Sequence, residues 1–71
     1  MKRSVSRVVI RDSKLMGGAP VFKGTRVPVG TLIDYLESGA SITEFLEGFP
    51  SVKRAQIVTF LEEAKEILLA A

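Results

Sequence analysis

The stretch Met16-Gly17-Gly18-Ala19-Pro20-Val21-Phe22-Lys23-Gly24-Thr25-Arg26-Val27-Pro28-Val29 decides how this chain folds. It holds three of the six glycines and two of the three prolines. Apolar residues flank the polar step Lys23–Arg26, which predicts two extended runs around a tight turn with Gly24 at positive φ. Pro28 fixes φ at a value that suits the first turn of a helix. We therefore expect this stretch to join an extended N-terminal part to a helical C-terminal part.

Upstream of this stretch, β-branched residues predict a short strand within Ser6–Ile10. Asp12 and Ser13 end it with turn chemistry, and Lys14–Met16 is expected to form one turn of helix. Strands this short do not make a stable sheet alone. They must pack on the helices or pair with another subunit.

Two short helices are expected after the stretch. The first runs over about 28–38 and ends at Gly39, with an apolar face of Val29, Leu32, Ile33 and Leu36. The second, about Ile42–Glu47, begins with a capping box of Ser41 and Glu44.

The third and longest helix is expected over about Val52–Leu69, with Ser51 as its N-cap. Its apolar stripe has helical spacing and should cover the core: Ile57, Phe60, Leu61, Ala64 and Leu68. Eighteen residues span about 27 Å, which is more than the two shorter helices can cover. We expect the apolar end, Ile67–Ala71, to stay exposed unless something else covers it.

The sequence thus predicts a single domain over residues 1–71 that is mainly α. Residues 1–27 form a basic arm with short strands and a small β-hairpin. Residues 28–71 form a three-helix bundle of the helix-turn-helix type, homeodomain-like or winged-helix-like.

Composition bounds the function. The 71 residues include no cysteine and no histidine, which excludes disulfides, thiolate metal sites and the commonest catalytic bases. The remaining carboxylate cluster, Glu62, Glu63 and Glu66, is expected on a solvated helix face. We expect no enzyme, no cofactor and no metal. A chain this small without staples gains stability from oligomers, so we expect a homodimer or a higher oligomer.

Charge is unevenly distributed along the chain. Residues 1–26 carry seven basic side chains against Asp12 alone, whereas residues 27–71 carry three basic and seven acidic side chains. A basic arm on an acidic body indicates a nucleic-acid or acidic protein partner. The alternative is a dimer in which the basic end of one subunit lies against the acidic part of the other, which explains the same asymmetry. No apolar run approaches the roughly 20 residues of a membrane span, and we expect a cytoplasmic protein.

The helix-turn-helix interpretation makes two groups of residues candidates for DNA contact. At the exposed start of the third helix they are Lys53, Arg54, Gln56 and Thr59. In the N-terminal arm they are Arg3, Arg7 and Arg11. The alternative is that the helix positions are ordinary solvated residues of a three-helix domain.

The motif Gly18-x-Pro20-x-x-Lys23-Gly24-Thr25-Arg26-x-Pro28-Val29, the helix ending at Gly39 and then Phe49-Pro50 resemble the family called domain of unknown function 433. The resemblance runs from about Val8 to Ala64. It implies a small prokaryotic helix-turn-helix-like protein, the antitoxin of a toxin–antitoxin pair whose toxin resembles a PIN-type ribonuclease.

Lys23 and Arg26 are the candidates for contact with such a partner. A planar guanidinium on a rigid hairpin can bind a carboxylate with two hydrogen bonds. The resemblance implies a toxin whose carboxylates hold a metal, where an arginine would compete with that metal. The alternative is an internal ion pair of Arg26 with an acidic residue of the helices, or capping of helix carbonyls; the acidic candidates are Asp34, Glu37 and Glu44.

Three functions follow as hypotheses. The first is an antitoxin-like interaction protein of a type II pair that neutralises a PIN-like ribonuclease and also binds its own operator DNA. The second is a stand-alone helix-turn-helix regulator. The third is a dimerisation module with neither activity.

Overall fold

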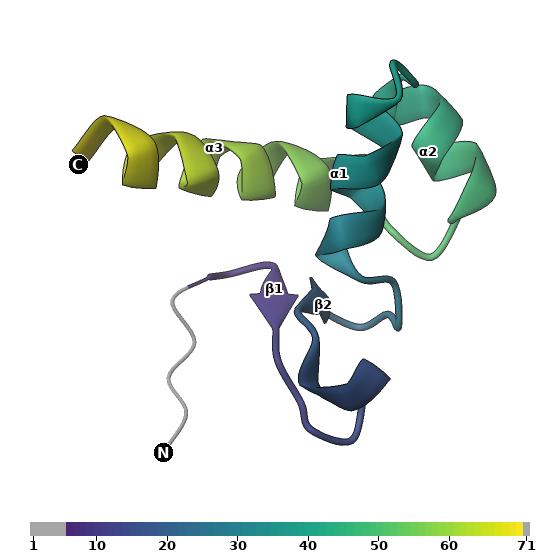
Figure 1. Ribbon diagram of the computed structural model, residues 1–71, viewed down its shortest axis with the longest axis vertical. Helices are drawn as coiled ribbons and strands as arrows, with labels where there is room; N and C mark the ends of the chain where they lie inside the picture. Colours follow the sequence, from purple (N-terminus) through teal and green to yellow (C-terminus); the bar gives the residue numbers. More distant parts are fainter. Residues whose placement is uncertain (1–5, 71) are drawn as a thin grey trace.

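The computed structural model describes residues 6–70 and is mainly helical, with a small antiparallel sheet before three helices. The predicted fold class is confirmed. In chain order the elements are β1 (Val9–Ile10), the 3-10 helix η1 (Met16–Gly18), β2 (Val21–Phe22), α1 (Val29–Glu37), α2 (Ile42–Gly48) and α3 (Arg54–Ala70) (Figure 1). Within the described residues, no helix has the length and apolarity needed to cross a membrane.

The N-terminal hairpin pairs β1 with β2, with Val9 opposite Phe22 and Ile10 opposite Val21. The predicted second arm after Gly24 is reduced to a single bridge between Val21 and Pro28. It stays short because α1 begins at the next residue. The turn predicted between the two arms is present, but the regular partner of β2 is the upstream strand.

The segment between β1 and β2 differs from the prediction. The expected helical turn at Lys14–Met16 is displaced to η1, two residues later. Asp12 explains the shift, because its carboxylate accepts a hydrogen bond from the Lys14 N–H at 2.9 Å and its carbonyl accepts one from the Leu15 N–H at 2.8 Å. These bonds make residues 12–15 a turn. The residues of η1 that follow all have positive φ, +51° at Met16, +66° at Gly17 and +89° at Gly18, so η1 is not a regular right-handed helical turn.

Helices α1 and α2 follow their local signals. Ser38 caps the end of α1 and Gly39 has a φ of +93°, as predicted for a residue that ends a helix. The capping box of α2 is complete: the Glu44 N–H donates to the Ser41 hydroxyl at 3.0 Å, and the Ser41 N–H donates to the Glu44 carboxylate at 2.7 Å.

Helix α3 starts at Arg54, two residues later than predicted, and Ser51 is not its N-cap. The side chain of Val52 is buried in the core, 3% exposed, whereas Pro50 and Ser51 before it are exposed. The Lys53 N–H instead donates to the Gln56 side-chain oxygen at 3.0 Å. Gln56 thus supplies the reciprocal half of a capping box one turn into the helix.

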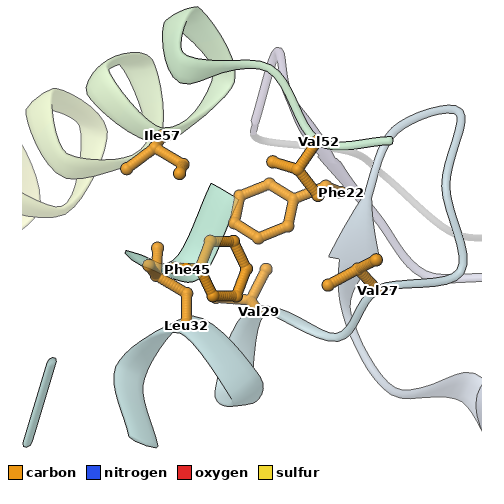
Figure 2. Close-up of a cluster of buried hydrophobic side chains, with 7 residues drawn as sticks. All are labelled: Phe22, Val27, Val29, Leu32, Phe45, Val52 and Ile57. Carbon is orange, nitrogen blue, oxygen red and sulfur yellow. The ribbon is translucent and has the colours of Figure 1, made fainter. Parts of the chain in front are cut away.

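The core lies where the hairpin, α1, α2 and the first turns of α3 meet (Figure 2). Phe45 of α2 is fully buried, with Phe22 of β2 on one side and Tyr35 of α1 on another, at ring-centroid distances of 6.5 and 5.3 Å. The cluster of buried residues is Phe22, Val27, Val29, Leu32, Phe45, Val52 and Ile57. Aromatic rings from the three helices and the hairpin therefore hold the domain together.

Two apolar faces are only partly used. On α3 the predicted stripe is correct at Ile57 and Phe60 but wrong at Leu61, which is exposed. Leu68 was expected both in this stripe and in the exposed end of the helix, and it is exposed. On α1, Ile33 was expected on the apolar face and is 42% exposed. On α3 the cause is that α1 and α2 are short and do not reach along the whole helix.

Candidate binding surfaces on the turn and on helix α3

The turn Phe22–Thr25 is fixed by its own hydrogen bonds. The Thr25 N–H and the Thr25 hydroxyl both donate to the Phe22 carbonyl, at 3.0 and 2.8 Å. Gly24 has a φ of +80°, which a type II turn requires at its third position. The Phe22 N–H donates to the Val27 carbonyl at 3.0 Å and closes the loop. Gly24 and Thr25 therefore act as turn formers here.

The same turn is attached to two other elements. The Lys23 N–H donates to the Val8 carbonyl at 2.8 Å, which extends the β1–β2 ladder by one bond. The Lys23 carbonyl accepts a hydrogen bond from the Gln56 side-chain amide at 2.9 Å. Gln56 thus uses both ends of its amide, one at the start of α3 and one on the turn.

Lys23 and Arg26 project from this fixed backbone as exposed side chains. Among residues 6–70, Arg26 makes no ion pair with Asp34, Glu37 or Glu44, the partners of the internal alternative. Within the described part of the chain, Lys23 and Arg26 are therefore two exposed cations at this turn that form no ion pair.

The four candidates at the start of α3 do not form one free surface. Arg54 donates to the Thr43 hydroxyl of α2 at 2.8 Å, and Gln56 bonds to the turn. Lys53 is exposed and Thr59 is half-buried. Two of the four side chains are thus engaged within the chain, and Lys53 is the one that remains fully exposed without such a bond.

The N-terminal candidates lie in different surroundings. Arg3 lies outside the described residues. Arg7 places its Nε 3.7 Å from the Glu63 carboxylate while most of its side chain, 82%, remains exposed. Arg11 is exposed directly after β1. The structure therefore leaves Arg11 as the arm's free cation among the two that it describes.

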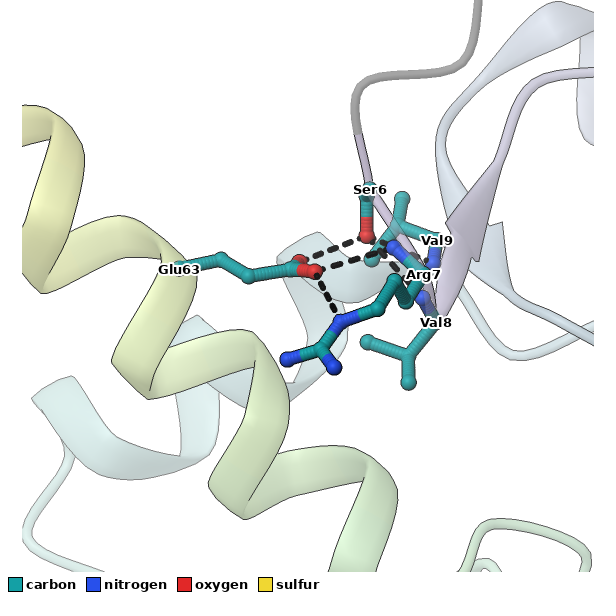
Figure 3. A network of polar contacts seen from close by, with 5 residues as sticks. All are labelled: Ser6, Arg7, Val8, Val9 and Glu63. Atoms are coloured by element: carbon teal, nitrogen blue, oxygen red, sulfur yellow. Dashed lines mark hydrogen bonds and ion pairs between the residues drawn. The ribbon is translucent and has the colours of Figure 1, made fainter.

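Glu63 of α3 binds the start of the N-terminal segment (Figure 3). Its two oxygens accept hydrogen bonds from the Ser6 hydroxyl at 2.7 Å and from the Arg7 N–H at 2.9 Å. The Ser6 oxygen in turn accepts from the N–H groups of Val8 and Val9, at 3.1 and 2.9 Å. These contacts attach the strand to the middle of α3.

These bonds lower the pKa of Glu63 below its ordinary value. The largest cause is the hydrogen bond from the Arg7 backbone N–H, followed by the bond from the Ser6 hydroxyl. Both favour the ionised carboxylate, as does the nearby guanidinium, whereas burial opposes them.

The sequence did not indicate this contact, because residues 57 apart carry no shared local pattern. The expectation that Glu62, Glu63 and Glu66 form a solvated cluster is wrong for Glu63. Glu62 pairs with Lys65 at 3.5 Å. Within the described residues no group of acidic side chains could hold a metal ion.

The last part of α3 carries an exposed apolar surface. Ile67, Leu68 and Leu69 are 67%, 74% and 77% exposed, as predicted. An open groove lies between α3 and the N-terminal segment, lined by Arg7, Glu63, Glu66, Ile67 and Ala70. Exposed apolar surface rimmed by charges is typical of a protein-binding surface.

Comparison with known proteins places most of the chain in a family. The model of the family described as "Protein of unknown function (DUF433)" matches residues 9–64. The uncharacterized protein y4eO of Sinorhizobium fredii is 36% identical over 50 residues, which are 70% of this chain and 23% of that protein. The chain thus spans less than a quarter of that relative's length. No solved structure matches the chain.

Proposed function

Because the chain belongs to the DUF433 family, we propose that it is the antitoxin-like component of a type II toxin–antitoxin pair. In this proposal it acts in the cytoplasm, binds a PIN-like ribonuclease and neutralises it. The identity of the partner comes from the family resemblance described above. The residues that would make the contact come from the geometry of the turn.

The observation that carries the proposal is the display of Arg26 and Lys23. Both side chains are exposed. Lys23 lies in the turn Phe22–Thr25, whose backbone is hydrogen-bonded to β1, to α3 and within itself, and Arg26 follows inside the loop that the Phe22–Val27 bond closes. A fixed backbone loses little conformational entropy on binding. An arginine held in this way can bind carboxylates with two hydrogen bonds, the geometry that a cluster of metal-binding carboxylates offers.

Operator binding is the second proposal, and fewer residues support it. Arg54 and Gln56, which a helix-turn-helix protein would turn toward DNA, are engaged with Thr43 and with the turn. Lys53 and Arg11 are exposed and could contact phosphates. We therefore propose protein binding as the first function and DNA binding as the second. DNA binding would belong either to the antitoxin of the pair or to a stand-alone regulator.

The protein-binding proposal is tested by coexpression with the product of the adjacent gene. Arg26→Ala should weaken inhibition of the ribonuclease at least tenfold while the melting temperature stays unchanged. Arg11→Ala is the matched control, because Arg11 is also an exposed arginine but lies outside the turn and the loop that follows it. The proposal fails if the protein neither copurifies with that product nor inhibits it, or if both variants lose inhibition equally.

The DNA proposal is tested with the promoter of its own operon at several salt concentrations. Each lost phosphate contact should reduce the slope of log K against log salt by about 0.9 for duplex DNA. Lys53→Ala and Arg11→Ala should each produce this change. Absence of salt-dependent binding at low ionic strength, with or without the partner, would exclude the DNA proposal.

A further inference from the structure

The second half of α3, Leu61–Ala70, has apolar residues on more than one side and extends away from α1 and α2 (Figure 1). Its large apolar residues are all exposed: Leu61, Ile67, Leu68 and Leu69. Charged residues lie between these apolar ones, at Glu62, Glu63, Lys65 and Glu66. Exposed apolar surface rimmed by charges is typical of a protein-binding surface.

One line of residues, which begins at Val58 just before this half and continues along it, has the spacing of a helix–helix seam. Val58, Leu61, Lys65 and Leu68 follow one another at intervals of three, four and three. Val58 is 49% exposed, Leu61 38% and Leu68 74%, and the Lys65 side chain is 60% exposed. We propose that this seam packs against the same seam of a second copy of the chain, with the two α3 helices antiparallel.

Charge complementarity selects the second copy and the antiparallel direction. In a parallel pair the two Lys65 side chains would face each other inside the seam and repel. In an antiparallel pair centred between Leu61 and Lys65, Val58 lies opposite Leu68 of the second copy, and Leu61 lies opposite Lys65 of the second copy. The aliphatic stem of each lysine then covers a leucine while its ammonium lies next to the other copy's Glu62.

The arrangement is self-complementary, as a two-fold interface requires. It makes the Lys65–Glu62 contact twice between the copies, replacing or sharing the contact that the two residues make within one chain at 3.5 Å. The small size of the domain is the reason to expect such a dimer. The buried cluster holds seven residues, and small domains without disulfides or metals commonly complete their core by association.

The first test measures the oligomeric state of the purified chain alone by sedimentation equilibrium. It is independent of the toxin assay, so failure of one proposal does not affect the other. Wild type should be dimeric at tens of micromolar, and Leu68→Glu should raise the dissociation constant at least tenfold. Ile33→Glu is the matched control, since Ile33 is an exposed isoleucine on α1 and should leave the constant unchanged.

The second test distinguishes contacts between copies from contacts within one chain. Glu62→Lys and Lys65→Glu should each weaken the homodimer, because like charges then face each other across the seam. Mixed together, the two variants should form heterodimers in clear excess, since each supplies the charge that the other needs. The repulsion within each chain persists in the mixture, so an intrachain effect cannot restore association.

A monomeric wild type, an Ile33→Glu variant as weak as Leu68→Glu, or a mixture without excess heterodimer would each overturn the proposal. Circular dichroism of the single variants should show unchanged helix content, which confirms that the substitutions act on association. A wild type that binds the adjacent gene's product through Leu68 while remaining monomeric alone would assign the seam to that partner instead.

Discussion

The two halves of α3 both carry large apolar residues but have opposite surroundings. In the first half, Arg54–Phe60, Ile57 is fully buried and the Phe60 ring meets Phe22 edge to face at a centroid distance of 6.0 Å. In the second half, Leu61–Ala70, Leu68 and Leu69 are about three-quarters exposed. The first half is built into the core, and the second half is held by the N-terminal segment through Glu63.

This difference shows what helical periodicity can and cannot specify. The spacing of apolar residues identifies a face, but a face is buried only where another element reaches it. At about 1.5 Å per residue, the 17 residues of α3 extend roughly 25 Å, whereas α1 and α2, with nine and seven residues, extend roughly 14 and 10 Å. The second half therefore has a face without a partner among the described residues of its own chain.

The largest difference in stability should appear when one side chain in each half is truncated to alanine. Ile57→Ala should lower the free energy of unfolding by about 3 kcal/mol, because it leaves a cavity beside Phe45 and Leu32. Leu68→Ala should change it by less than about 0.5 kcal/mol at concentrations where the chain is monomeric. Urea unfolding of both variants measures the difference. Equal losses would show that the second half is buried in the monomer.

A change of about 2 kcal/mol is expected at the turn that supports the first half. Gly24→Val places a β-branched residue at a φ of +80°, which is strained whatever the space around it. Gly30→Val is the matched control, since Gly30 also has open space at its Cβ position but lies in the helix α1. If thermal unfolding shows equal melting temperatures for the two variants, backbone strain at Gly24 is not the cause.

The next effect concerns the polar attachment of the first half. Gln56→Ala removes the bond to the Lys23 carbonyl and the bond from the Lys53 N–H, and it should lower the free energy of unfolding by about 1 kcal/mol. Gln56→Glu keeps an acceptor for the Lys53 N–H but has no donor for the Lys23 carbonyl. Its free energy of unfolding should therefore lie between those of the wild type and Gln56→Ala. Denaturant unfolding curves give the order of stability of the three proteins. A Gln56→Ala variant as stable as the wild type would show that the two Gln56 hydrogen bonds do not stabilise the fold.

Local signals predicted most of the fold. The positive φ of Gly24 and of Gly39 and the capping box at Ser41 each depend on a few neighbouring residues, and the structure has all three. The predicted start of α3 was wrong, although Ser51 is a good capping residue. Val52, which follows Ser51, is buried in the core before the helix begins. Here tertiary packing decided between two locally acceptable positions.

The candidate surfaces were less predictable. The types of Arg54 and Gln56 suit DNA contact, yet their side chains bind Thr43 and the turn. Such contacts depend on how elements meet in space, and no spacing in the sequence encodes them. The bond between Ser6 and Glu63 is the clearest case, since the two residues lie 57 positions apart.

The smallest effect should be the pH dependence of the attachment of the second half. The hydrogen bonds from Arg7 and Ser6 lower the pKa of Glu63 in the folded protein below its ordinary value of 4.5. A group with a lowered pKa stabilises the fold above the pKa of the unfolded chain. That stabilisation is lost as the pH falls through the folded pKa. Above about pH 5 the contribution of Glu63 is therefore complete, and in more acidic solution it disappears.

Comparison with Glu63→Gln isolates this contribution, because the amide keeps an oxygen that can accept from the Arg7 N–H but carries no charge. The other carboxylates titrate alike in both proteins and cancel in the difference. Wild type should be more stable than Glu63→Gln by about 0.5–1 kcal/mol at pH 6, a modest value for a contact at the surface. The two urea curves should converge as the pH falls through the folded pKa of Glu63, which lies below 4.5. A difference that stays constant from pH 6 to pH 3 would mean that the charge of Glu63 does not hold the N-terminal segment on α3.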